Sequence, residues 1–190
     1  GTAAGLRATR MVIEDNLKDL LVGQNPFNTE KIWNDMFWHV RGFGRKGIAF
    51  QAISAVDIAL WDLKAKALDL PLYQLLGPYT DTVPIYGSGG WTNYSEEELV
   101  EEQMSYVNRG IPRVKMKVGK DFGQSEREDL QRIEAVRAAV GDDVEIFVDA
   151  NNGYYAKQAI RMAAEFEEYG IAWFEEPVLA DDIPGLAEIR

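Results

Sequence analysis

The second half of the chain alternates short apolar segments with longer segments that carry apolar residues at helical spacing. This pattern predicts strands separated by helices. The predicted strands span residues 83–87, 113–119, 145–151 and 172–178, and the helices between them span residues 95–110, 125–140 and 155–169. Strands connected through helices are expected to be parallel, with the helices covering the sheet. Both a doubly wound open sheet and part of an eight-stranded βα barrel fit this order.

The first half of the chain has a different pattern, in which helical spacing recurs in successive segments. Helices are predicted over residues 6–22, 28–42 and 49–68, followed by a short helical turn at 71–77. We therefore expect two units, a helical unit over residues 1–80 and a strand–helix unit over residues 81–190.

Composition narrows the class of protein and of partner. With 190 residues and 46% hydrophobic content, the chain can bury a sizeable core. Its net charge of −11 repels phosphate backbones and anionic lipids, so we expect neither nucleic acid nor a membrane as partner. No apolar run approaches the roughly 20 residues that cross a bilayer. The sequence has no cysteine, which excludes thiolate chemistry and fits a cytoplasmic protein.

The predicted strand at residues 113–119 carries lysines where a core would be expected. Successive side chains of a strand point to opposite sides, so Val114 and Met116 share one face while Lys115 and Lys117 share the other. Alternate lysines usually mark a solvent-exposed face. The neighbouring strands favour a second interpretation, in which the lysines line a functional site.

Charged or polar residues also lie at the ends of the next two predicted strands. Asp149 and Asn151 end the third strand, and Glu175 ends the fourth. In a βα barrel the carboxyl ends of the strands build the active site, so these side chains are expected to converge there with the two lysines. Asp149 and Glu175 supply hard oxygen ligands of the kind that Mg²⁺ selects. Two neighbouring ammonium groups near a divalent ion predict a lowered pKa for at least one lysine.

These groups suit the removal of a proton from the carbon next to a carboxylate. The reaction produces an enediolate, whose negative charge a metal ion offsets while a base of matched pKa takes the proton. Lys117 lies closer to the end of the strand and is the predicted base. Lys115 is predicted to tune Lys117 and to hold an anionic group.

Several segments resemble the enolase superfamily, and within it the mandelate racemase/muconate lactonizing enzyme subgroup: "VKMKVG", "FVDANNGY", "WFEEPV" and "AISAVDIALWDLKAKALDLPLYQLLG". Sites of this superfamily combine a Lys or His base with Mg²⁺. The resemblance implies that Lys117 is the α-proton base and that Lys115 is its partner. It also implies that Asp149 and Glu175 bind Mg²⁺ and that Asn151 contacts the substrate.

The resemblance implies a fold as well, an α/β protein with a (β/α)8-type, TIM-like barrel preceded by the helices of an α+β capping domain. Only the first four strands of such a barrel are present in the sequence. We therefore expect residues 1–80 to be the helical part of the capping domain. Residues 81–190 are expected to be the first half of the barrel of a longer, homo-oligomeric enzyme.

Three functional interpretations remain. The leading one is a Mg-dependent lyase or isomerase that acts on a hydroxy acid or acid sugar, as an acid-sugar dehydratase or a racemase/epimerase. The second is a non-catalytic half-barrel that serves as a binding or assembly module. The third is a dinucleotide-binding sheet, but the segment "YGSGGW" lacks the G-x-G-x-x-G spacing that such a sheet needs after its first strand.

Overall fold

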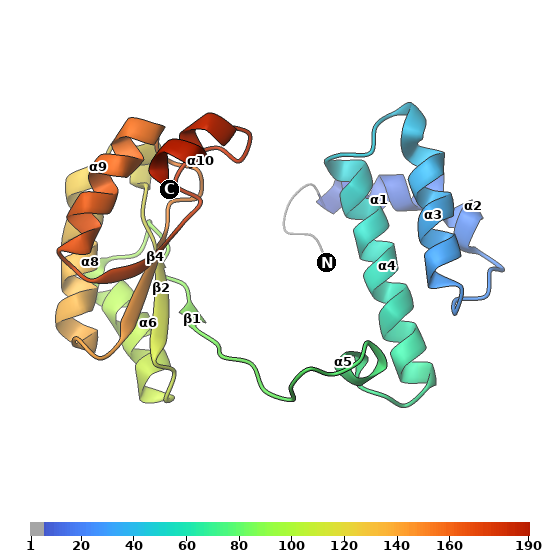
Figure 1. Cartoon of the computed structure of the whole chain (residues 1–190), viewed down its shortest axis with the longest axis horizontal. Helices are drawn as coiled ribbons and strands as arrows, with labels where there is room; N and C mark the ends of the chain where they lie inside the picture. The colour runs from blue at the N-terminus through green and yellow to red at the C-terminus, as the bar shows by residue number, and fades with distance from the viewer. Residues whose placement is uncertain (1–5) are drawn as a thin grey trace. The chain divides into compact units, whose positions relative to one another are not determined.

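The computed structural model describes residues 6–190, which form two compact units divided after Thr82 (Figure 1). Each unit has its own hydrophobic core. The first five residues of the predicted unit 1–80 lie outside the described residues. Within residues 6–190, no helix is both long and apolar enough to span a lipid bilayer.

The first unit is built from helices around the long helix α4. Its elements are α1 (Leu6–Val12), a π-helical turn (Ile13–Leu17), α2 (Lys18–Leu21), α3 (Thr29–His39), a 3-10 turn (Val40–Gly42), α4 (Ile48–Ala67) and α5 (Leu72–Leu75). Helices α1 and α3 both pack against α4. Leu17, Met36 and Ile53 are fully buried between these elements. The helix predicted over residues 6–22 therefore contains a π turn, and Leu17 at its end enters the core.

The second unit contains a parallel sheet with the strand order β1-β2-β3-β4. The strands are β1 (Gly87–Ser88), β2 (Arg113–Lys117), β3 (Glu145–Asp149) and β4 (Ile171–Glu175). The helices are α6 (Glu96–Asn108), α7 (Lys120–Gly123), α8 (Glu126–Val140), α9 (Ala156–Glu167) and α10 (Ile183–Ile189). Sequential order is typical of a βα barrel, whereas a doubly wound sheet reverses its strand order partway. The prediction of parallel strands from part of a βα barrel is confirmed.

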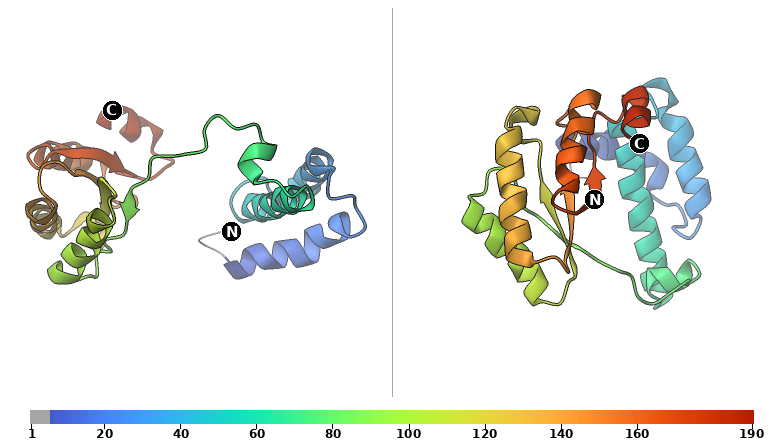
Figure 2. Two further views of the ribbon diagram at one scale, coloured as in Figure 1. Left: turned by 90° about the horizontal axis from the view of Figure 1, so that it is seen from below. Right: turned by 60° about the vertical axis from the view of Figure 1, so that its left-hand side comes forward.

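Helices α6, α8 and α9 lie side by side over one face of this sheet (Figures 1 and 2). The strands contribute Met116 and Val148 to the core on this face, and the helices contribute Ile133, Met162 and Phe166. Because successive strand residues point to opposite sides, this packing turns the alternate positions of β2, β3 and β4 to the other face. The lysines and carboxylates of these strands lie there.

The first strand is shorter than predicted. Residues 83–87 were expected to be extended and paired, but only Gly87 and Ser88 pair with β2. Pro84 has no N–H group to donate to a strand ladder, which disfavours pairing around it. The side chains of Val83 and Ile85 are accordingly exposed.

Candidate active site

The carboxyl ends of β2, β3 and β4 bring Lys117, Asp149 and Glu175 into one row. Lys117 is the partner of Asp149 in the register of β2 and β3, and Asp149 is the partner of Glu175 in the register of β3 and β4. Paired residues of parallel strands point to the same face of a sheet. Lys115 lies two residues earlier on β2 and shares this face. The structure therefore brings together the lysines and carboxylates that the sequence pattern singled out.

The four side chains form a chain of ion pairs. The Nζ of Lys115 lies 2.6 Å from Oε2 of Glu175 and 3.4 Å from Oδ2 of Asp149. The Nζ of Lys117 forms an ion pair with the same Oδ2 of Asp149. The side chains of Asp149, Lys115 and Lys117 are only 3%, 7% and 13% exposed, whereas that of Glu175 is 33% exposed. Two mostly buried cations are thus balanced by one buried and one half-buried carboxylate.

This arrangement shifts the pKa of Asp149 downward. Burial alone would raise its pKa, but the hydrogen bond from Lys117, the backbone N–H of Asn151 and the charges of both lysines outweigh burial. Asp149 therefore keeps its charge to a lower pH than an unperturbed aspartate does.

The pKa of Lys115 is raised. Burial acts to lower it, but the hydrogen bond and charge of Glu175, together with Tyr86 and the charge of Asp149, outweigh burial. The sequence pattern predicted a lowered pKa for at least one lysine. At Lys115 the direction is the opposite, because the charges closest to its ammonium group are carboxylates.

Asn151 lies two residues after the end of β3 and is hydrogen-bonded to residues at the ends of both β3 and β4. Its backbone N–H donates to Oδ1 of Asp149 at 2.9 Å, and its side-chain amide donates to Oε2 of Glu176 at 3.0 Å. Asn151 and Glu176 both have left-handed backbone conformations, with φ of 45° and 46°. The loop after β3 is therefore fixed against the loop after β4, and Asn151 lies next to Asp149 and to Glu176, the residue that follows Glu175.

Two aromatic side chains that the sequence pattern did not single out accompany the lysines. The Nζ of Lys115 lies 5.2 Å from the ring centroid of Tyr86, and that of Lys117 lies 5.5 Å from the ring centroid of Trp91. These distances are within the range of cation–π contacts. A pocket next to the carboxylates is lined by Tyr86, Phe147, Trp173 and Glu175. The charged groups therefore border an apolar wall.

The donor set fits part of the coordination shell of Mg²⁺. Mg²⁺ is commonly held by one or two carboxylates and keeps several waters. Asp149 and Glu175 are paired across neighbouring strands, and the ammonium group of Lys115 already lies between their oxygens. The two carboxylates thus already bind one positive charge, the ammonium group of Lys115. Residues 6–190 contain no group of three or more His, Cys, Asp or Glu side chains placed to hold a metal ion.

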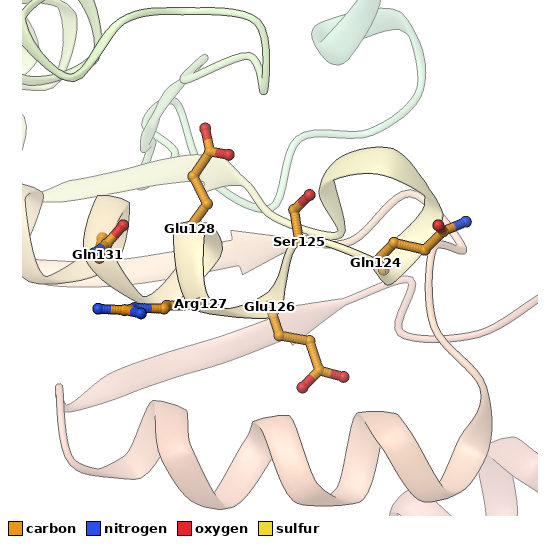
Figure 3. A pocket seen from close by; sticks show the side chains of 7 residues that line it. Gln124, Ser125, Glu126, Arg127, Glu128 and Gln131 are labelled. Atoms are coloured by element: carbon orange, nitrogen blue, oxygen red, sulfur yellow. The ribbon is translucent and has the colours of Figure 1, made fainter.

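A second pocket lies at the start of α8 and has no comparable charge arrangement. It is lined by Gly123, Gln124, Ser125, Glu126, Arg127, Glu128 and Gln131 (Figure 3). Its carboxylates point away from each other (Figure 3). Glu126 accepts hydrogen bonds from Gln158 and Arg161, and Glu128 pairs with Lys120. The convergent charges at the strand ends are the better candidate site.

Behind the site lies a buried polar cluster that the sequence analysis missed. Asp129 and Arg132 on α8 are almost fully buried, and Asp129 accepts a hydrogen bond of 2.8 Å from the hydroxyl group of Tyr154. A signal was present in the sequence, because both residues lie on the same helical stripe as the buried Ile133 and Val136. Charged residues on an apolar stripe indicate buried polar contacts.

The Tyr154→Phe variant is expected to lose part of the alkaline sensitivity of the fold. Burial and the neighbouring charge of Asp129 raise the pKa of Tyr154 far above its ordinary value. The folded state therefore keeps this proton at a pH where the unfolded chain loses it, so Tyr154 contributes a fall in stability as pH rises above about 10. Loss of its hydrogen bond should also destabilise the variant by about 1–2 kcal/mol at neutral pH.

Urea unfolding of wild type and Tyr154→Phe between pH 8 and pH 11 measures both effects. The neighbouring Tyr155 is 82% exposed, so Tyr155→Phe is the matched control and should leave the stability and its pH dependence unchanged. An alkaline slope that is equal in Tyr154→Phe and wild type would contradict the assignment.

Comparison with known proteins places both units in families. The family described as mandelate racemase/muconate lactonizing enzyme, N-terminal domain, matches residues 1–77. The family described as enolase C-terminal domain-like matches residues 98–190. The chain is 39% identical over 186 residues to L-talarate/galactarate dehydratase of Salmonella typhimurium. This match covers 97% of the chain and 45% of the relative.

Solved structures give the same result. A racemase from Streptomyces coelicolor A3(2) with bound magnesium has a TM-score of 0.91 and 36% identity, covering 98% of this chain and 52% of that one. The Salmonella dehydratase liganded with Mg and L-lyxarohydroxamate has a TM-score of 0.89 and 37% identity, covering 100% of this chain and 48% of that one. The chain thus spans about half the length of the relatives it matches.

Proposed function

Because the chain belongs to the enolase superfamily, in its mandelate racemase/muconate lactonizing enzyme subgroup, we propose that its strand ends carry part of an active site that removes the α-proton of a carboxylate substrate. The observation that carries this proposal is the row formed by Lys117, Asp149 and Glu175. It places a primary amine beside two carboxylates at the carboxyl-terminal ends of the strands, where βα barrels have their active sites.

In this proposal Lys117 is the base. It ends β2, keeps partial access to solvent, and lies against Asp149, and the substrate proton would be accepted by its neutral amine form, after the proton of the ion pair has left. Removal of a proton by a positioned side chain contributes about 10²–10⁴-fold to a rate. Lys115 lies deeper, between Glu175 and Asp149, where its positive charge suits an anionic group of the substrate and the ionised state of both carboxylates.

Asp149 and Glu175 are the proposed Mg²⁺ ligands. When bound, Mg²⁺ supplies a positive charge that offsets the negative charge developing on the substrate carboxylate as the enediolate forms. The backbone N–H of Asn151 donates to Asp149 and orients it, and the side-chain amide of Asn151 is the proposed polar contact with the substrate.

We assign the two units to the two parts of such an enzyme. The unit up to Thr82 is proposed to be the helical part of the capping domain, and the unit from Val83 onward the first half of the barrel. The complete protein is proposed to be a homo-oligomer, because large apolar side chains on the first unit, such as Trp38 and Ile58, are exposed. Sedimentation analysis of the full-length protein tests this assembly.

The proposed substrates are hydroxy acids, and among them acid sugars such as galactarate and L-talarate. The reaction is either loss of water, which leaves a 2-keto-3-deoxy acid, or inversion at the α-carbon. Both reactions begin with loss of the α-proton, so exchange of this hydrogen with solvent is the shared first readout.

The test uses the full-length protein stripped of metal and incubated in D₂O with galactarate, L-talarate or mandelate. We expect proton NMR to show exchange at the α-carbon, loss of water or epimerisation of at least one acid with Mg²⁺ present, and none with EDTA. Reaction that is equally fast in EDTA would contradict the role of Asp149 and Glu175. Absence of every reaction across a wider panel of α-hydroxy acids would overturn the proposed function.

A further inference from the structure

Helix α8 carries two opposite charges inside the core of the second unit. Asp129 is 0% exposed and Arg132 is 3% exposed, one turn apart on the face of the helix that carries Ile133 and Val136. A buried ion is unfavourable unless hydrogen bonds and opposite charges compensate it. The groups that compensate this pair lie in the two loops on either side of Lys117.

Asp129 binds the loop that follows β2. Its Oδ2 accepts a hydrogen bond of 2.9 Å from the backbone N–H of Gly119, and its Oδ1 accepts one of 3.3 Å from that of Lys120. The hydroxyl group of Tyr154 donates to the same carboxylate and accepts from Gly119. Gly119 has a φ of 73°, and a Cβ there would lie 2.8 Å from the carbonyl oxygen of Ala150. The chain two residues after Lys117 is therefore held in one conformation.

Arg132 binds the loop that follows β1. Its guanidinium group donates to the carbonyl oxygens of Gly90 at 3.1 Å, Trp91 at 2.9 Å and Tyr94 at 3.0 Å. The carbonyl oxygen of Gly90 also accepts a hydrogen bond of 3.0 Å from the backbone N–H of Lys117. Arg132 therefore shares an acceptor with Lys117, and it fixes the backbone that carries the ring of Trp91 near the Lys117 ammonium group.

We propose that Asp129 and Arg132 are positioning residues for Lys117. Asp129 holds the loop that follows Lys117 on β2, and Arg132 holds the loop after β1, whose Gly90 accepts the backbone hydrogen bond of Lys117. The inference rests on the proposed function in so far as Lys117 is the base. Placement of a reacting group within about 1 Å can change a rate by about 10²-fold. A base at the end of a strand needs such support, because the strand ladder of β2 ends at Lys117.

A role in stability alone would leave the partners of the two charges unexplained. Buried charges are weak evidence for stability, since apolar replacements of similar volume are often neutral or stabilising. Here the hydrogen bonds of Arg132, and those of Asp129 other than the one from Tyr154, go to backbone groups of residues 90–94 and 119–120. The loop at residues 90–94 contacts Lys117 through the carbonyl oxygen of Gly90, and residues 119–120 follow soon after Lys117 in the chain.

The variants Asp129→Asn and Arg132→Met test the inference in the full-length protein, with Arg132→Lys as the conservative variant. Val136→Ala is the matched control, because Val136 is fully buried on the same helix and is a member of its apolar core. The first readout is amide hydrogen exchange, which needs no substrate. We expect the amide of Lys117 to exchange about tenfold faster in Arg132→Met and that of Gly119 about tenfold faster in Asp129→Asn. Neither amide should change more than about twofold in Val136→Ala.

The second readout is catalysis with whichever of galactarate, L-talarate and mandelate the wild type turns over. We expect kcat to fall by about 10- to 100-fold in Arg132→Met and Asp129→Asn, with KM within about threefold of wild type. The kinetic isotope effect for substrate deuterated at the α-carbon should rise, and Arg132→Lys should restore part of kcat. A residue needed only for folding would reduce the fraction of active protein and leave the isotope effect unchanged.

The two readouts separate the inference from the proposed function. Unchanged exchange at Lys117 and Gly119 in the variants overturns the inference even where the wild type is active. An equal fall of kcat in Val136→Ala also overturns it. If the wild type acts on none of the acids, the proposed function is in doubt, while faster amide exchange confined to these two variants still supports the hold on Lys117.

Discussion

Replacing Lys117 with methionine is expected to reduce exchange of the substrate α-hydrogen with solvent by about 10²–10⁴-fold, the contribution of a positioned general base. Methionine keeps the length of the side chain but cannot accept a proton. Asp149 retains Lys115 at 3.4 Å and the N–H of Asn151 at 2.9 Å, so the fold should tolerate the change. Exchange is measured by proton NMR in D₂O with saturating Mg²⁺ and the acid sugar on which the wild type acts.

The matched control is Lys157→Met, because Lys157 lies exposed on α9. It removes the same charge from the same unit and should leave exchange within about twofold of wild type. Lys115→Met should reduce exchange too, with a larger effect on KM, because its charge is proposed to hold the substrate anion. Exchange that survives unchanged in Lys117→Met would rule out Lys117 as the base.

Replacing Asp149 with asparagine is expected to have the largest effect on stability. Asp149 is the shared partner of two mostly buried ammonium groups. Removing one partner of a buried ion pair typically destabilises a protein by about 3–5 kcal/mol, and we expect the lower end because Lys117 keeps some contact with water. Mg²⁺ is expected to raise the thermal stability of the wild type, since a ligand stabilises the state that binds it, and the change should abolish this rise.

The difference in free energy of unfolding between wild type and Asp149→Asn should depend on pH, and the direction follows from the pKa of Asp149. The pKa of Asp149 is lowered in the folded state, so its contribution is fully present above the ordinary aspartate value of about 3.9 and is lost as pH falls toward the lowered value. Urea unfolding at pH 7 and pH 3 measures it. Asp142→Asn, at an exposed position before β3, is the control and should change stability by less than about 0.5 kcal/mol. Equal stability of wild type and Asp149→Asn at pH 7 would contradict the ion-pair arrangement.

Much of the fold and the positions of the charged residues follow from periodicity. Alternation in β2 placed Lys115 and Lys117 on the face opposite Met116, and the parallel order of the strands placed Asp149 beside Lys117. The capping box of Ser95 and Glu98 that begins α6 is also the kind of local signal that sequence carries. The alternation and the capping box depend on neighbouring residues, so one stretch of chain is enough to predict them, whereas the position of Asp149 beside Lys117 follows from the parallel order of the strands.

The features that were missed depend on contacts between distant segments. Asp129 and Arg132 lie on the apolar stripe of α8, but their partners are in the loops at residues 90–94 and 119–120, which the pattern of the helix does not identify. The direction of the pKa shift at Lys115 depends on Glu175, which lies sixty residues away and 2.6 Å from it. Trp91 was interpreted only as part of a glycine-rich loop, and its place near Lys117 follows from the hold of Arg132 on its carbonyl oxygen.

The ion pairs of Lys115 have a consequence for biogenesis. Because the ammonium groups of Lys115 and Lys117 together balance the charges of Glu175 and Asp149, the newly made polypeptide can complete these strand ends without a metal ion. Proteins whose ligands repel one another until metal arrives behave differently, since chelators unfold them. In the proposed site the strand ends would therefore be folded before Mg²⁺ binds, and binding would require the Lys115 ammonium group to move away from the two carboxylates.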